Sequence, residues 1–335
     1  MQLANRSAVA EPLVTLALQS TSAIPWEFMS KLAFLFPGQG SQAAGMGRDL
    51  AENFPAARRV FEQADDALGF PISKLCFEGP GDELKLTENT QPAILACSIA
   101  AYEVLRERGV KPDYVAGHSL GEYSAMVAAG AIDFADAVRL VRKRGRYMQE
   151  AVPAGVGAMA ALLGMDPAHI TPICEQAAQG EIVSPANFNS PAQIVIAGHA
   201  AAVGRAMELA AAAGAKRAVL LPVSAPFHCA LMKPAQDRLA PDLDACPFRD
   251  LAIPLVNNVA AQEIGTAAEA REGLREQVPN PVRWEETVRY LASQGVSHFV
   301  EIGPGRVLIG LVRNIDRSLK VSNVEDAATV EKLEP

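Results

Sequence analysis

The stretch Val115-Ala116-Gly117-His118-Ser119-Leu120-Gly121-Glu122-Tyr123 predicts a sharp turn between a strand and a helix. The apolar run from Tyr114 to Ala116 is typical of a buried strand, and the apolar residues after Ser119 recur at helical spacing. The Gly-x-Ser-x-Gly pattern between them lifts a serine hydroxyl above a sheet, because a Cβ at either glycine would crowd the turn. Backbone N–H groups at the start of the helix would face any negative charge formed at the serine. Ser119 is therefore a candidate nucleophile, although an ordinary glycine-flanked turn can have the same pattern.

The composition is that of an ordinary globular protein with enough apolar residues for one large or two moderate domains. Of 335 residues, 50% are hydrophobic and 20% charged, with a net charge of −8. This balance argues against a nucleic-acid surface, which needs clustered basic charge. No apolar run approaches the roughly 20 residues of a membrane span, so we expect no membrane association.

The cysteines argue for a reducing compartment, and we expect a cytoplasmic protein. They are odd in number, scattered, and include no Cys-x-x-Cys pair. This excludes the usual zinc and disulfide frameworks, so we expect no metal and assign most of them to the core. The cysteines are Cys76, Cys97, Cys174, Cys229 and Cys246.

Both ends of the chain differ from the rest. Residues 1–28 hold one basic residue, Arg6, and their apolar stretch is interrupted by Glu11-Pro12, so they make a poor signal peptide. We expect a disordered N-terminal extension, with the folded chain starting near Met29. The sequence from Asp316 is polar, and we expect residues 321–335 to form a partly frayed tail.

Residues 29–152 and 225–320 predict an α/β fold, an α/β-hydrolase-like large domain with a mostly parallel sheet. Lys31 to Phe36 is an expected strand, and the loop Pro37–Gln42 follows at its carboxyl end, where open α/β sheets bind ligands. Helical patterns cover 48–68 and about 90–108. Further strands are expected at 253–257 and 298–302, and further helices at 282–293 and 305–315.

Residues 153–224 predict a small inserted subdomain. Strands at 157–163, 182–188, 193–197 and 217–223 alternate with helices at 167–178 and 200–213. This β-α-β-β-α-β order is that of the ferredoxin-like fold. A cleft between the subdomain and the large domain would be a natural substrate site.

Arg144 stands out in the helix expected from Asp133 to about Val152. At 100° per residue, the other basic residues of this helix face away from its apolar stripe, but Arg144 lies at the stripe's edge. An arginine on the core side needs an anionic partner or several acceptors. It is either part of an internal salt bridge or a guanidinium that grips a substrate carboxylate.

His228 is the candidate base for the serine. Among the five histidines, it alone lies in a loop where the chain re-enters the large domain beside the expected cleft. No Asp or Glu occupies an obvious strand-end loop between Ser119 and His228. Either a backbone carbonyl or amide orients the imidazole, or a carboxylate not evident from the sequence does so.

Seven segments in this order resemble those of the malonyl-CoA:acyl carrier protein transacylases of bacterial fatty-acid synthesis, and the resemblance covers about residues 31 to 315. The segments are Phe36-Pro37-Gly38-Gln39-Gly40-Ser41-Gln42, Gly117-His118-Ser119-Leu120-Gly121-Glu122-Tyr123-Ser124, Arg144-Gly145, Asn187-Phe188-Asn189-Ser190-Pro191, Phe227-His228, Asn280-Pro281-Val282-Arg283-Trp284 and Glu301-Ile302-Gly303-Pro304-Gly305.

The resemblance implies a role for each matching residue. Ser119 would be the nucleophile, His228 the general base and acid, and Arg144 the partner of the malonyl carboxylate. The backbone N–H groups of Gln39 and Leu120 would form the oxyanion hole. The backbone carbonyl of Gln277 would orient the histidine.

Five more residues complete the predicted site. Met148, Phe227 and Asn189 would bind substrate, and Phe227 resembles the residue of malonyl-selective forms. Lys216 and Arg217 would dock the acidic acyl carrier protein.

The resemblance implies ping-pong transfer through a malonyl-serine, with malonyl-CoA and acyl carrier protein as partners, no cofactor, and a monomer. The alternative is a serine esterase or thioesterase that uses the same Ser119 and His228. A non-catalytic module that docks a carrier protein is a third reading. Arg144 separates these hypotheses, because a hydrolase of neutral acyl groups has no use for a core-side guanidinium.

Overall fold

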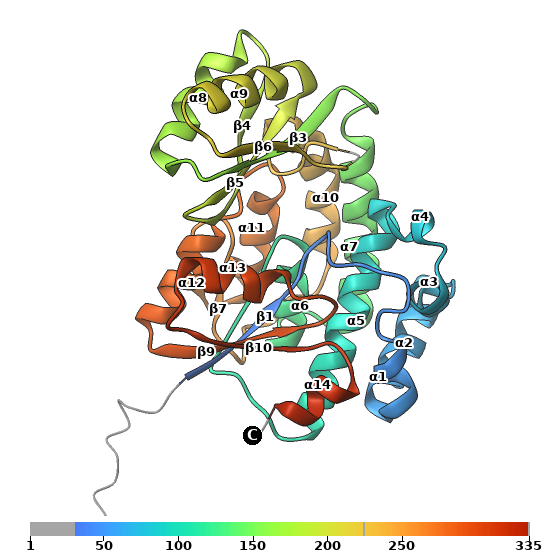
Figure 1. Ribbon diagram of the computed structural model, residues 1–335. Coiled ribbons are helices and arrows are strands. Elements are labelled where there is room, and N and C mark those ends of the chain that lie inside the picture. Colours follow the sequence, from blue (N-terminus) through green and yellow to red (C-terminus); the bar gives the residue numbers. More distant parts are fainter. Residues whose placement is uncertain (1–30, 224, 334–335) are drawn as a thin grey trace, which may run out of the picture.

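The computed structural model describes residues 31–223 and 225–333. The predicted extension at 1–28 lies outside these residues. Within them, the chain has no helix of the length and apolarity that crossing a membrane requires. Two sheets organise the fold, a six-stranded one and a four-stranded one (Figure 1).

The larger sheet is mostly parallel, and its strands run in the spatial order β10-β9-β1-β2-β7-β8. Only the last pair, β7 with β8, is antiparallel. β1 lies inside the sheet and is apolar at nearly every position, as expected for a parallel strand covered on both faces. The strands are β1 (Lys31–Phe36), β2 (Tyr114–Gly117), β7 (Leu255–Val256), β8 (Glu263–Ile264), β9 (Val296–Ile302) and β10 (Lys320–Val324).

Helices cover both faces of this sheet (Figure 1). Around the large sheet they are α1 (Arg48–Asn53), α2 (Pro55–Leu68), α3 (Ile72–Glu78), α4 (Gly81–Leu84), α5 (Thr87–Glu107), α6 (Leu120–Ala128), α7 (Phe134–Glu150), α10 (Lys233–Ala245), α11 (Ala267–Gln277), α12 (Trp284–Ser293), α13 (Val307–Ile315) and α14 (Ala327–Lys332).

Alternate residues of β1 enter two separate cores, because successive side chains of a strand point to opposite faces. Phe34 and Phe36 pack with α2, α5, α6 and α7. Ala33 and Leu35 pack on the other face with α12 and α13. The fold class predicted from the sequence, α/β with a mostly parallel sheet, is confirmed.

The smaller sheet is antiparallel, with the spatial order β4-β5-β3-β6, and it lies at the top of Figure 1 with its two helices above it. Its apolar face and these helices form a third core. Its elements are β3 (Gly157–Leu163), a 3₁₀ turn (Pro167–His169), α8 (Ile170–Ala178), β4 (Val183–Ser190), β5 (Gln193–His199), α9 (Ala200–Ala212) and β6 (Arg217–Leu220).

The helix predicted over 48–68 is two helices. α1 ends at Asn53, and α2 begins at Pro55 after the extended residue Phe54. Proline disfavours helical geometry in the residue before it and is well tolerated at the first position of a new helix.

The prediction of a frayed C-terminal tail is wrong for the described residues. β10 pairs in parallel with β9 and forms one edge of the large sheet, so the large sheet extends past the predicted boundary at 320. α14 then begins with a capping box, in which Asp326 and Thr329 bond each other's backbone N–H groups. The polar residues of β10 misled the sequence reading because an edge strand can keep one side exposed to water.

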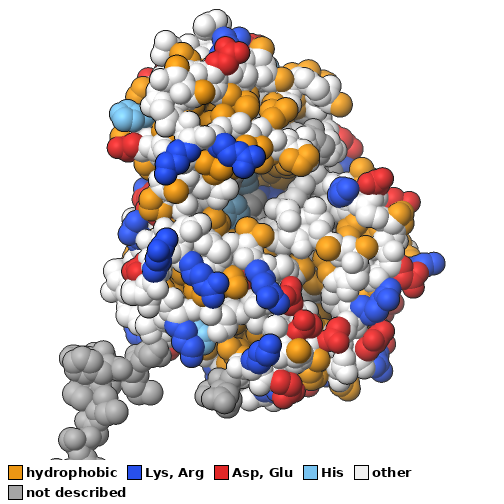
Figure 2. Space-filling view, in the orientation of Figure 1, with side chains coloured by type: hydrophobic (Ala, Val, Ile, Leu, Met, Phe, Trp, Pro, Cys, Tyr) orange, Lys and Arg blue, Asp and Glu red, His pale blue; other side chains and the backbone are white. Residues whose placement is uncertain are grey.

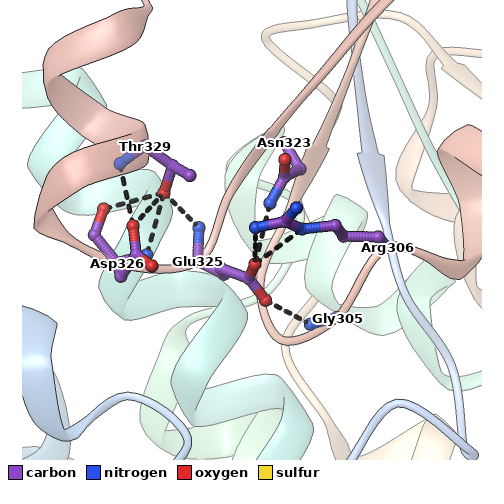
Figure 3. Close-up of polar contacts among 6 residues, drawn as sticks. All are labelled: Gly305, Arg306, Asn323, Glu325, Asp326 and Thr329. Carbon is purple, nitrogen blue, oxygen red and sulfur yellow. Dashed lines mark hydrogen bonds and ion pairs between the residues drawn. The ribbon is translucent and has the colours of Figure 1, made fainter.

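Glu325 ties this C-terminal segment to the loop after β9 (Figure 3). Its carboxylate accepts hydrogen bonds from the backbone N–H of Gly305, from Arg306 Nε and from Asn323 Nδ2, at 3.1, 2.8 and 3.2 Å. A Cβ on Gly305 would lie 3.4 Å from Ser41 Cβ, so this loop packs against the loop that follows β1.

Candidate active site

Ser119 lies on a strained turn between β2 and α6. Its φ of 52° and ψ of −108° are rare for a residue with a side chain, and such strain persists only where the surroundings fix it. The flanking glycines allow the turn: a Cβ on Gly117 would come within 1.9 Å of the carbonyl carbon of Gly121, and one on Gly121 within 1.9 Å of Phe36 O. The Asn258 side-chain oxygen accepts from Ser119 N at 2.7 Å and holds the turn from the far side.

His228 contacts the serine hydroxyl directly. Ser119 Oγ and His228 Nε2 are 2.7 Å apart. His228 Nδ1 faces two backbone carbonyl oxygens, of Gln277 at 3.0 Å and of Asn280 at 3.2 Å. Carbonyl oxygens only accept, so Nδ1 carries the hydrogen and Nε2 is free to accept the serine proton.

The imidazole is neutral at physiological pH. Burial, assisted by the nearby charge of Arg144, lowers the pKa of His228 to about 3. A neutral imidazole is the form that acts as a base.

Arg144 also reaches the serine, from α7. Its side chain is 1% exposed, and its Nη2 donates to Ser119 Oγ at 3.1 Å. Two glutamine oxygens accept from the same guanidinium, Gln91 Oε1 at 2.9 Å and Gln277 Oε1 at 2.8 Å. Among residues 31–223 and 225–333 no carboxylate pairs with it, so the internal salt bridge considered from the sequence is absent from this part of the chain.

A close approach of two helices brings Gln91 to Arg144. Gly145 lies in α7 where it crosses α5, and a Cβ at this position would come within 2.5 Å of Thr87 O. Gln91 is on α5, which begins at Thr87, one turn before it. The glycine that follows Arg144 therefore allows α5 to present its glutamine to the guanidinium.

Gln277 joins the three residues. Its backbone oxygen accepts from His228, its Oε1 accepts from Arg144, and its Nε2 donates to Ser119 O at 2.9 Å. The same Nε2 donates to Glu122 Oε2, also at 2.9 Å. Because Arg144 only donates and Ser119 O only accepts, the orientation of the carboxamide is fixed.

Ser119, His228 and Arg144 line a small cavity of about 120 Å³. The cavity adjoins a groove of about 910 Å³, and five residues line both spaces. Figure 2 shows the molecule hollowed between the part that carries the small sheet and the rest, with Lys and Arg side chains on both rims. The shared residues are Gln39, His118, Asn187, Leu221 and Val223.

The site thus combines a serine on a strained elbow, a neutral histidine and a buried guanidinium. The model of the acyl transferase domain family matches residues 33–335. This chain belongs to the acyl transferase domain family. The match spans nearly all of the described residues, including both sheets.

Curated and solved relatives of this acyl transferase are similar over most of its length. The malonyl CoA-acyl carrier protein transacylase of Bacillus subtilis (strain 168) is 53% identical over 304 residues, 90% of this chain and 96% of the relative. The protein of the same name from Escherichia coli (strain K12) is 52% identical over 303 residues, 90% and 98% of the two chains.

Two solved structures have the same fold. An acyl carrier protein S-malonyltransferase from Vibrio cholerae is 48% identical and covers 91% of this chain and 100% of its own, with a TM-score of 0.89. A malonyl-transacylase solved in complex with a type II PKS acyl-carrier protein is 51% identical, covers 90% and 98%, and has a TM-score of 0.89.

Most of the residues predicted for the site of this acyl transferase lie together. Gln39, Leu120, Met148 and Phe227 line the small cavity with Ser119, Arg144 and His228. Asn189 does not: it lines the groove, and its Oδ1 is 2.8 Å from His118 Nε2.

Lys216 and Arg217 lie apart from the cavity. Both are exposed at the start of β6, at the edge of the small sheet, and neither lines the cavity or the groove.

The sequence reading missed several lining residues. Met159, Leu221 and Val223 belong to or follow strands of the small sheet and have no chemical signature. Gln91 did have a signal in the sequence, because this polar residue is followed by Pro-Ala-Ile-Leu-Ala in a helix with an almost wholly apolar centre. A buried glutamine needs partners, so its place beside Arg144 could have been suspected.

The described part of the chain has no cluster of three or more His, Cys, Asp or Glu side chains that could hold a metal ion. All five cysteines are free and buried. Burial raises the pKa of Cys229, which neighbours His228 in sequence, to about 11.

Proposed function

We propose that this acyl transferase moves the malonyl group of malonyl-CoA to the phosphopantetheine thiol of an acyl carrier protein, through a malonyl ester on Ser119. The observation that carries the proposal is that one serine oxygen contacts a neutral imidazole at 2.7 Å and a buried guanidinium at 3.1 Å. The first contact supplies a nucleophile, and the second supplies a partner for an acyl group with a free carboxylate.

In the first half-reaction, Ser119 Oγ attacks the thioester carbonyl while His228 Nε2 takes its proton. The backbone N–H groups of Gln39 and Leu120 stabilise the oxyanion. Leu120 suits this role because it is the first residue of α6, and first-turn N–H groups have no acceptor within their helix. The C–S bond then breaks, and the imidazolium returns its proton to the departing coenzyme A thiolate.

In the second half-reaction, the carrier's thiol takes the place of coenzyme A. His228 takes the thiol proton, the sulfur attacks the malonyl ester, and the proton returns to Ser119 Oγ as the C–O bond breaks. The carbonyl oxygens of Gln277 and Asn280 keep Nδ1–H in place throughout, so a third acid is not needed. The kinetics are ping-pong, and every proton is moved by this chain's own groups.

Arg144 selects the acyl group. Its guanidinium is buried among neutral acceptors, so a carboxylate that enters the cavity forms charge-assisted bonds without losing an existing ion pair. An uncharged acyl group forms no such charge-assisted bond with the guanidinium. Met148 and Phe227 line the same cavity and bound the size of the acyl group.

The groove accommodates the pantetheine arm that both thioesters share. It leads from the cavity past His118, Asn187 and Asn189 to the surface. At the mouth of the groove we place the carrier protein, with Lys216 and Arg217 at the edge of the small sheet as contacts for its acidic surface.

We extend the proposal to the organisation of the protein. The large sheet with the serine elbow fits an α/β-hydrolase-like domain of two segments, and the small sheet's order fits an inserted ferredoxin-like subdomain at 153–224. We propose a monomer that acts in the cytoplasm, where thiols such as the five free cysteines are kept reduced.

Intact-mass measurement after incubation with malonyl-CoA tests the proposal. We expect one malonyl group per chain, its loss on addition of phosphopantetheinylated carrier, and no labelling of the Ser119→Ala variant. Release of the malonyl group mainly to water would instead identify a thioesterase. Labelling that persists in Ser119→Ala would refute the role of the serine.

A further inference from the structure

A buried carboxylate lies beside the site and takes no part in the steps above. Glu122 is in the first turn of α6 and is 0% exposed. Its Oε2 accepts from Asn258 N at 3.0 Å and from Gln277 Nε2 at 2.9 Å. Its Oε1 is buried and has no hydrogen-bond partner among the described residues. Hydrogen bonds from Gln277 and Asn258 favour the ionised form of such a buried carboxylate, and an opposite charge nearby favours it further.

The opposite charge is Arg144, and a single carboxamide connects the two. Arg144 Nη2 donates to Gln277 Oε1 at 2.8 Å, and Gln277 Nε2 donates to Glu122 Oε2. Gln277 thus carries a hydrogen-bond relay from cation to anion. The attraction acts both ways, since Arg144 favours the ionised form of Glu122 and Glu122 favours the charged form of Arg144.

The other groups around Glu122 carry no charge near neutral pH. Burial raises the pKa of Tyr123, on the same helix, well above its usual value, and that of His228, beyond Arg144, is about 3. From α11 the facing residues are Gln277 and Gly273, and from the segment after β7 the contact is the backbone of Asn258. Arg144 and Glu122 therefore balance each other in the acyl-free site.

We propose that Glu122 is the counter-charge of Arg144 while the site holds no acyl group, and that Glu122 takes up a proton when a malonyl carboxylate binds to that arginine. The inference rests on the proposed function, because it needs an acyl group with a free carboxylate. Glu122 acts through Gln277 and does not touch substrate, so it is a positioning and charge-balancing residue.

Proton uptake follows from the charge count. One guanidinium cannot balance two carboxylates when one of them, Glu122, is fully buried, so the carboxylate without a direct contact to the guanidinium protonates. Burial has already raised the pKa of Glu122 to about 7, and a second negative charge raises it further. The unpartnered Oε1 can hold the proton while Oε2 keeps both of its hydrogen bonds.

Acetyl-CoA provides the internal control. It has the same nucleotide, pantetheine and thioester as malonyl-CoA but brings no carboxylate to Arg144. We therefore expect proton uptake with malonyl-CoA and none with acetyl-CoA. Because the malonyl complex binds more protons, malonyl affinity falls as pH rises above 7, whereas acetyl affinity does not.

The test is titration calorimetry of the Ser119→Ala protein, which binds without reacting, in buffers of different ionisation enthalpy. At pH 7.5 we expect roughly 0.5–1 proton taken up per malonyl-CoA and close to zero per acetyl-CoA, because Glu122 is mostly ionised there in the free site. Between pH 7 and 8.5 the Kd for malonyl-CoA should rise about tenfold more than that for acetyl-CoA.

A matched pair of variants assigns the proton. Glu122→Gln, added to Ser119→Ala, keeps an oxygen for Asn258 and Gln277 but removes the charge, so uptake and the pH dependence should disappear. Glu301→Gln makes the same change at another glutamate that is 0% exposed and whose Oε2 accepts from Ile309 N at 3.0 Å. This control should leave uptake unchanged.

Each outcome decides the matter. Malonyl-CoA binding without uptake, or uptake that persists in Glu122→Gln, overturns the inference and leaves the proposed function intact. Failure of malonyl-CoA to acylate the unsubstituted enzyme overturns the proposed function itself. If Glu122→Gln does not fold, the comparison of malonyl-CoA with acetyl-CoA in the protein that retains Glu122 still decides whether uptake accompanies the carboxylate.

Discussion

Substitution of Arg144 by alanine is the sharpest test of how this site selects its acyl group. The guanidinium is 1% exposed and donates to Ser119, Gln91 and Gln277, all of them neutral. A bound carboxylate would form two charge-assisted hydrogen bonds, each of about 1.5–3 kcal/mol. Part of this gain offsets the loss of the glutamine contacts, which leaves a net contribution of about 3 kcal/mol.

In rate terms, Arg144→Ala should lower kcat/KM for malonyl transfer by about a hundredfold, since 1.36 kcal/mol corresponds to a factor of ten. Acetyl transfer should hold or rise, because the nucleophile and base remain and the cation no longer disfavours an uncharged group. The assay follows transfer from malonyl-CoA and from acetyl-CoA to the same carrier protein, at equal enzyme concentration. The ratio of the two rates is the readout.

Arg146→Ala is the matched control, because Arg146 lies on the same helix and is exposed. It should leave both rates unchanged. An equal loss of malonyl and acetyl transfer in Arg144→Ala would show that the arginine only supports the fold and would refute its role in selection. Thermal denaturation of both variants separates that outcome from simple unfolding.

Three further predictions concern stability. First, folding lowers the pKa of His228 to about 3, so the contribution of this residue to stability is complete above pH 6.5 and is lost as the pH falls toward 3. Between pH 7 and pH 4 the free energy of unfolding should therefore drop by about 3 kcal/mol more than in His228→Asn. Equal drops in the two proteins would contradict this. Second, Gly145→Ala should destabilise the protein by about 1–3 kcal/mol, because the new Cβ would lie 2.5 Å from a carbonyl oxygen of α5. Gly204→Ala, in a helix with open space around the glycine, should stabilise it by about 0.5–1 kcal/mol. The same melting point for both variants would refute the close-packing argument. Glu325→Ala should lower the unfolding free energy by about 1 kcal/mol in denaturant titrations, and Glu331→Ala, which removes an exposed ion pair with Arg108, should change it by less.

The chemistry-bearing residues were predictable because each breaks a local pattern. Ser119 lies between glycines at the junction of two periodicities, and Arg144 is a cation at the edge of an apolar stripe. Both signals arise from steric or electrostatic demands that a few neighbouring residues reveal. The order of elements in the small sheet was predictable for the same reason, since short alternating patterns there are separated by clear turns.

What could not be predicted depends on contacts between distant segments. No local signal says that Gln277 meets Ser119, 158 residues earlier, or that Asn258 braces the elbow. β10 was missed because its polar residues become a strand only when β9 offers an edge to pair with. Glu122 belongs to the recognised motif, yet its partners come from the segments around Asn258 and Gln277.

The connections through Gln277 also determine when the protein becomes an enzyme. The serine turn is made early in the chain, but Gln277 lies more than 150 residues later. Its carboxamide contacts Ser119 and Arg144, and its backbone oxygen accepts from His228. The central strand β1 likewise waits for β9 to cover its second edge. During synthesis, Ser119 therefore emerges long before the residue that positions it and its partners. Catalytic competence arrives with the last third of the polypeptide, as a late event of folding in which long-range contacts close together.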